Sequence, residues 1–128
     1  IVHARGALEE VSLTLRRIGG LYGVVHSFSG SEPQAQRLWE IGFHLGIGGP
    51  VTYERAQRLR RIVARMPIEF LLLESDAPDQ PDAAHRGERN EPARVADVLR
   101  CVAELRGEAE ADVAAATTAN ACRLFGID

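Results

Sequence analysis

The chain has 128 residues, 45% of them hydrophobic and 26% charged, which is enough for one domain with a buried core. Its net charge of −3 excludes a protein that coats nucleic acid through a broad basic surface, but not an enzyme that acts on DNA at one local site. The two cysteines lie far apart and outside any metal-ligand motif, which favours reduced thiols in the cytoplasm, and no apolar run is long enough to cross a membrane.

Strand and helix patterns alternate along the chain. The strand patterns cover residues 1–3, 22–26, 43–48 and 68–73, and the last is a continuous apolar run, as in a buried parallel strand. Apolar residues at helical spacing predict helices over residues 8–18, 32–41, 53–66, 92–106 and about 111–124. Such alternation predicts an α/β protein with four parallel strands, each followed by a helix, and one extra helix at the end. Four such units are half of a (β/α)8 TIM barrel, which takes about 250 residues.

The helix boundaries have recognisable sequence signals. Ser31 with Gln34 three positions later predicts a capping box, and Pro33 suits the first turn. Thr52 is a plausible cap for the third helix, and Gly107 ends the fourth. A long polar loop covers residues 76–90.

Three potential metal ligands stand at strand ends: His3 at the first, His26 at the second and Asp76 at the fourth. Because the carboxyl ends of parallel barrel strands open on one face, we expect these side chains to converge there. Two imidazoles and a carboxylate suit Zn²⁺ or Mn²⁺, and such a site can support hydrolysis with the carboxylate as proton acceptor. The alternative is structural, since a lone strand-end histidine is often only hydrogen-bonded and Asp76 precedes Ala-Pro and could cap a turn.

Five further residues are candidates for contact with a substrate. An arginine fork suits phosphate oxygens, and Arg5 directly follows the first strand. The other candidates follow the second strand or lie in the long loop: Ser29, His85, Arg86 and Asn90. Arg86 could instead pair with acidic loop residues, and Asn90 could cap the helix that starts at Pro92.

Several segments resemble the TatD family of metal-dependent deoxyribonucleases, in order and at family spacing over the whole chain. The His-x-Phe-Ser-Gly and Asn-Glu-Pro elements together are the most specific part of this resemblance. The segments are residues 1–5 (IVHAR), 23–30 (GVVHSFSG), 72–78 (LLESDAP), 85–92 (HRGERNEP) and 117–126 (TTANACRLFG).

The resemblance implies a TIM barrel of the amidohydrolase type with two divalent metal ions (Zn, Mn or Mg) in the complete site. His3 matches the family's strand-five ligand, His26 the strand-six ligand, and Asp76 the strand-eight ligand and general base. The family's His-x-His pair and bridging Glu have no counterpart and would lie before Ile1, where the chain looks cut. Residues 1–128 therefore resemble one partial domain, strands five to eight.

The resemblance also implies the function: a hydrolase that cleaves phosphodiester bonds, with DNA as the expected substrate and no membrane partner. Alternatives are an amide or ester hydrolase of the same superfamily, or a non-catalytic half-barrel. Ala4, Gly6 and the segment 79–81 depart from the family pattern, and the last of these could alter substrate choice.

We expect the isolated chain to be inactive and to self-associate, because half a barrel leaves two sheet edges unpaired. We also expect apolar side chains on the strands to be open to water, namely Val25, Leu45, Ile47 and Leu72.

Overall fold

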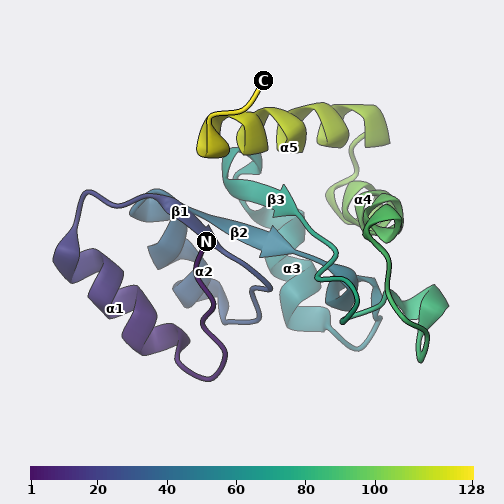
Figure 1. The fold of residues 1–128 in the computed structure, drawn as a ribbon, viewed down its shortest axis with the longest axis horizontal. Coiled ribbons are helices and arrows are strands. Elements are labelled where there is room, and N and C mark those ends of the chain that lie inside the picture. Colours follow the sequence, from purple (N-terminus) through teal and green to yellow (C-terminus); the bar gives the residue numbers. More distant parts are fainter.

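A three-stranded parallel sheet in the order β1-β2-β3 forms the centre of the computed structural model, which describes all residues 1–128 (Figure 1). In this register Gly23 pairs with Phe43, and Leu45 with Leu71. The predicted α/β architecture with a parallel sheet is confirmed. The strands are β1 (Gly23–Val25), β2 (Phe43–Ile47) and β3 (Leu71–Leu73).

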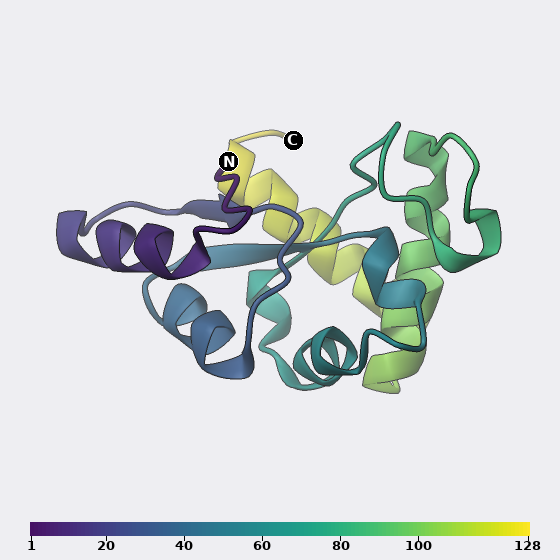
Figure 2. The ribbon, with the colours of Figure 1, turned by 90° about the horizontal axis from the view of Figure 1, so that it is seen from below.

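Five α-helices surround the sheet, and α2 and α3 lie together on one side of it, as Figure 2 shows. Helix α1 packs on α2, while α4 and α5 pack on each other and on β3. None of these helices is both long enough and apolar enough to cross a bilayer. Their bounds are α1 (Leu8–Ile18), α2 (Glu32–Glu40), α3 (Gln57–Arg65), α4 (Val95–Arg106) and α5 (Glu110–Phe125). Short 3₁₀ turns cover η1 (Gly49–Thr52), η2 (Ile68–Phe70), η3 (Ala83–His85) and η4 (Pro92–Arg94).

The predicted first strand is reduced to one bridging residue, Val2, which pairs in parallel with Val25. The Val2 N–H donates to the Val24 carbonyl at 2.8 Å, and the His26 N–H donates to the Val2 carbonyl at 3.0 Å. The neighbouring chain leaves the extended conformation two residues after Val25, at Ser27, which is left-handed (φ 53°). The prediction of a full strand over residues 1–3 was therefore wrong in extent, although the pairing and its direction are present.

The apolar run 68–73 is only half strand. Residues 68–70 form a 3₁₀ turn, closed by the Phe70 N–H on the Pro67 carbonyl at 3.2 Å, and only the last three residues pair with β2. The buried amide of Asn120 holds this shape by donating to the Ile68 and Leu71 carbonyls at 2.7 and 2.9 Å. Apolar composition alone did not reveal the turn.

The helix-boundary predictions had mixed outcomes. The Ser31–Gln34 capping box is present in both directions, and Gly107 ends α4 in a left-handed conformation. The prediction that Thr52 caps the third helix was wrong, since α3 begins five residues later, at Gln57. The Thr52 hydroxyl instead donates to the Gly49 carbonyl at 2.6 Å and accepts the Ala83 N–H at 2.8 Å.

The core lies between the sheet and the helices. Val25, Leu45 and Ile47 belong to one cluster of 16 buried residues, and each is at most 1% exposed. The expectation that they face water was wrong, because their side of the sheet is the one that packs on the helices; Leu72 is also buried. The exposed large apolar side chains lie instead near the ends of the chain, on α1 and between α1 and β1: Ile1, Leu13, Ile18, Leu21, Tyr22, Phe125 and Ile127.

Candidate metal centre

The predicted ligands line one cavity at the carboxyl ends of the strands. His3 follows the Val2 bridge, His26 follows β1, and Asp76 lies three residues beyond β3. The cavity has a volume of about 650 Å³, and Arg5 and Ser29 also line it. The strand-end geometry thus brings together five of the eight residues that the sequence suggested.

The two imidazoles are in direct contact. His3 Nδ1 lies 2.7 Å from His26 Nε2, and the ring centroids are 4.9 Å apart. Two nitrogen ligands of one tetrahedral Zn²⁺ are about 3.3 Å apart, given Zn–N distances of about 2.0–2.1 Å. A small outward movement of the two rings would therefore admit such an ion, and this pair of nitrogens fits a borderline divalent metal.

Asp76 stands apart from the imidazole pair. Its carboxylate does not form a group with the two rings in which all ligand atoms lie within 4.8 Å of one another. Its Oδ2 accepts a hydrogen bond from the Gln80 amide at 2.7 Å, and that amide also donates to the Ser27 hydroxyl at 2.7 Å. Asp76 is thus held in the cavity wall with its other oxygen free of protein donors.

Glu74 is a site residue that the sequence reasoning missed. Its Oε1 accepts the Ser27 N–H at 2.6 Å and lies 3.8 Å from His26 Nδ1. Burial raises the pKa of the Glu74 carboxyl, although the Ser27 N–H and the neighbouring His26 act in the opposite direction. Strand alternation held a signal, because residues two apart share a face and Glu74 follows Leu72 by two.

Backbone strain is concentrated at this cavity. Ser27, Asp76 and Gln80 have φ values of 53°, 56° and 51°, and they are the only residues other than glycine with positive φ in the chain. All three line the cavity and are joined by the Gln80 amide. Non-glycine residues in this region cost roughly 1–3 kcal/mol each and cluster at functional sites, which supports a functional reading of the cavity.

Three of the predicted substrate-contact residues lie outside the cavity lining: His85, Arg86 and Asn90. His85 Nδ1 donates to the buried Asp82 carboxylate at 2.8 Å, and the Arg86 guanidinium lies over the Tyr53 ring at 5.9 Å.

Asn90 is 3% exposed and, from outside the cavity lining, stabilises the loop that carries Asp76. Its amide donates to the Ser75 and Asp79 carbonyls at 2.7 and 2.8 Å, while its own Oδ1 accepts the Glu91 N–H at 2.9 Å. It does not cap α4, which has no side-chain cap.

A second group of possible ligands is Asp82, His85 and Asp97, whose ligand atoms all lie within 4.8 Å of one another. The donors around it already satisfy these groups. Asp82 accepts from His85 and from the Ala84 N–H, and Asp97 pairs with Arg100 at 2.9 Å. These hydrogen bonds and the Asp97–Arg100 ion pair explain this cluster without a metal.

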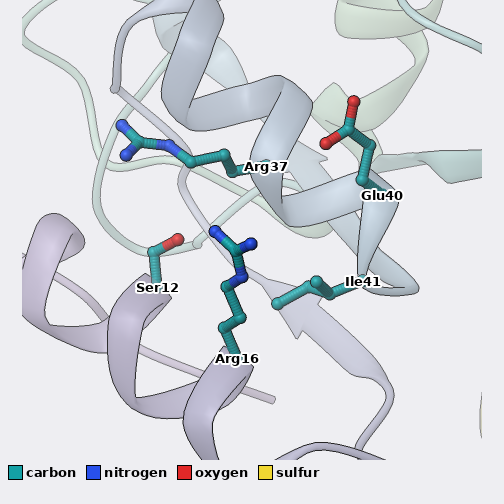
Figure 3. Close-up of a pocket in the computed structure, with 5 residues that line it drawn as sticks. All are labelled: Ser12, Arg16, Arg37, Glu40 and Ile41. Atoms are coloured by element: carbon teal, nitrogen blue, oxygen red, sulfur yellow. The ribbon is translucent and has the colours of Figure 1, made fainter.

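Another cavity, of about 260 Å³, lies between α1 and α2 and contains Ser12, Arg16, Arg37, Glu40 and Ile41 (Figure 3). It contains no imidazole and no residue of the strand-end cavity. The strand-end cavity is therefore the candidate centre.

The chain is also similar to known proteins over nearly its whole length. Residues 1–126 match the family model described as TatD related DNase. A metal-dependent hydrolase from Haemophilus influenzae is 38% identical over 97% of this chain and 48% of that protein. The 3'-5' ssDNA/RNA exonuclease TatD from Citrobacter rodentium is 42% identical over 81% of this chain and 41% of that protein.

The solved structures show the same half-length match. The crystal structure of YJJV, a TatD homolog from Escherichia coli K12, has a TM-score of 0.93 at 38% identity, over 98% of this chain and 49% of that one. The chain thus spans about half the length of the curated relatives that it matches. The predicted partial α/β barrel is confirmed by this similarity.

Proposed function

Because the chain belongs to the TatD family of metal-dependent hydrolases, we infer that it supplies one part of the active site of a phosphodiesterase that acts on single-stranded DNA. One observation carries this proposal: His3 Nδ1 and His26 Nε2 meet at 2.7 Å in a cavity that also contains Asp76 and Arg5. The name of the Citrobacter rodentium relative, an exonuclease of single-stranded DNA and RNA, supports the choice of substrate.

His3 and His26 would together hold one divalent ion, and Asp76 would be a ligand of a second. A bound ion polarises a phosphoryl oxygen and neutralises charge on the scissile phosphate. Of the candidate metals Zn, Mn and Mg, the donor set of two imidazoles and a carboxylate suits Zn²⁺ or Mn²⁺.

The other residues at the cavity have separate proposed roles in the reaction. The free oxygen of Asp76 accepts the proton of the attacking water, while Gln80 fixes the other oxygen at 2.7 Å and so sets the direction of the carboxylate. Arg5 and Ser29 border the same cavity and bind phosphate oxygens of the strand. Asn90 and His85 support the loop from outside and do not touch the substrate.

The chain spans about half of its relatives' length, and we propose that it supplies about half of a complete site. Asp76 and the imidazole pair lie apart, which suits two separate metal positions, each completed by residues outside this chain. The 128-residue chain alone is therefore proposed to bind metal weakly and to be inactive as a nuclease.

A chimera provides the test. This chain matches Escherichia coli YjjV over 98% of its own length and 49% of YjjV, at a TM-score of 0.93, and it is joined to the part of YjjV that this match leaves uncovered. With Mn²⁺, the chimera should shorten single-stranded oligonucleotides, and His26→Ala should abolish this. A folded, metal-binding chimera that hydrolyses lactones or amides but leaves DNA and RNA intact would favour the amide or ester hydrolase alternative and refute the proposal.

A further inference from the structure

The space for Glu74 is created by Gly46 in β2 and by Gly48 directly after that strand. A Cβ atom at Gly46 would stand 2.2 Å from Glu74 Oε2, and one at Gly48 would stand 3.3 Å from Glu74 Cγ. Real Cβ atoms do not approach an oxygen as closely as the first of these distances. Strand β2 therefore has no side chain where the Glu74 carboxylate lies, and the carboxylate fills that space.

Within this space the carboxylate contacts two consecutive residues at the end of β1. Its Oε1 accepts the Ser27 N–H at 2.6 Å, a short hydrogen bond, and lies 3.8 Å from His26 Nδ1, longer than a hydrogen bond but close enough for its charge to act on that nitrogen. The left-handed conformation of Ser27 accompanies this contact. Glu74 thus fixes the backbone directly after His26 and faces one side of its ring.

The two nitrogens of His26 consequently face different partners. Nδ1 faces the Glu74 carboxylate, and Nε2 faces His3 Nδ1 at 2.7 Å in the cavity. A carboxylate near Nδ1 favours a proton on that nitrogen, which leaves the lone pair on Nε2. A neutral imidazole with a free Nε2 lone pair is the form that binds a metal, and a carboxylate behind a histidine ligand both orients the ring and increases its basicity.

We propose that Glu74 is a positioning residue for the metal centre: its carboxylate fixes the ring orientation and tautomer of His26 so that Nε2 points into the cavity. This inference rests on the proposed function, because it assigns His26 to a metal. A purely structural role, in which Glu74 only ties the end of β3 to the end of β1, is the competing explanation. The two differ in what happens to the His26 ring.

The primary test measures that tautomer without metal. Long-range proton–nitrogen NMR on the ¹⁵N-labelled 128-residue chain, at a pH where His26 is neutral, reports which ring nitrogen carries the proton. We expect Nδ1–H in the wild-type chain and a shift towards Nε2–H in Glu74→Gln, which keeps an acceptor for the Ser27 N–H but removes the charge. Glu69→Gln is the matched control, since Glu69 is an exposed acid just before β3.

The second measurement is Zn²⁺ affinity by calorimetry on the same three chains. Loss of such a supporting carboxylate lowers metal affinity by roughly 10–100-fold, so E74Q should bind that much more weakly while E69Q is unchanged. If E74Q does not unfold cooperatively, Glu74→Asp, which keeps the charge and withdraws it by one methylene, replaces it.

The outcomes separate the two proposals. An unchanged His26 tautomer in E74Q overturns the positioning role, as does wild-type Zn²⁺ affinity in that variant. A wild-type chain that binds no Zn²⁺ but shows the tautomer shift would keep the positioning of the ring and refute only the metal assignment.

Discussion

Replacing Asn90 with alanine should loosen the candidate site from the loop side without touching any proposed ligand. The substitution removes two hydrogen bonds to the Ser75 and Asp79 carbonyls, at 2.7 and 2.8 Å, and one from the Glu91 N–H at 2.9 Å. Each such bond contributes about 1 kcal/mol net, and a buried group left without a partner costs about 1–3 kcal/mol. We therefore expect Asn90→Ala to lower the free energy of unfolding by about 2–4 kcal/mol, a large part of the about 5–15 kcal/mol of a typical domain.

Asn120 offers a matched control. It is equally buried, at 2% exposed against 3% for Asn90, and its amide also donates to two carbonyls, those of Ile68 and Leu71. Asn120 lies on α5, and its hydrogen bonds reach the start of β3, away from the loop that carries Asp76. Asn120→Ala should destabilise the chain by a similar amount, but it should not open the loop that carries Asp76 more than the rest of the protein.

The assay combines urea unfolding, followed by the fluorescence of the single tryptophan, with amide hydrogen exchange over residues 75–80. A local loss of 2 kcal/mol corresponds to roughly 30-fold faster exchange. We expect this acceleration in the loop for Asn90→Ala and not for Asn120→Ala. If both variants exchange alike in the loop, or if Asn90→Ala unfolds within about 0.5 kcal/mol of the wild type, the loop-fastening role is refuted.

Four further predictions follow from the site and the surface. His3→Ala and His26→Ala should each weaken Zn²⁺ binding by at least about tenfold in calorimetry while His85→Ala does not; equal effects would move the metal to the other cluster. In the YjjV chimera, Asp76→Asn should reduce turnover by about 10²–10⁴-fold with an unchanged circular dichroism spectrum, and near-normal turnover would remove it as proton acceptor. Burial lowers the pKa of His44 below its ordinary value of 6.5, so the unfolded state takes up this proton first as the pH falls. Stability should therefore decrease as the pH drops below that value, and a denaturation series in which His44→Gln keeps the same slope would contradict this. The seven exposed large apolar side chains predict self-association at micromolar concentration, and sedimentation as a compact monomer would count against it.

Local signals in the sequence were sufficient for most elements of the fold. The Ser31–Gln34 capping box and the glycine after α4 correctly marked helix ends, because these signals act through the backbone of the residues that carry them. The prediction that Thr52 caps a helix failed for a tertiary reason, because its hydroxyl accepts the N–H of Ala83, 31 residues later. The prediction of a strand over residues 68–70 failed for a similar reason, since Asn120 on α5 donates to the Ile68 carbonyl in this turn.

The candidate centre was partly predictable for the same reason. The position of a residue at a strand end is a local property, so the convergence of His3, His26 and Asp76 on one cavity could be expected. Gln80 could not be found in this way, and for Glu74 the position two residues after Leu72 indicated a face of the sheet but not its contacts. Glu74 depends on the space at Gly46, and Gln80 depends on a loop conformation that brings its amide to Ser27 across 53 residues of sequence.

The three left-handed residues at the cavity have a consequence for protein engineering. Glycine adopts this conformation at no steric cost, so replacing Ser27 or Gln80 with glycine should relieve strain in the folded chain. The same replacements would remove the hydroxyl and amide that direct Asp76, and would add backbone freedom to the unfolded chain. Directed evolution of this chain for heat resistance alone would therefore tend to erode the cavity, and selection for thermal tolerance should be coupled to a screen for the site itself.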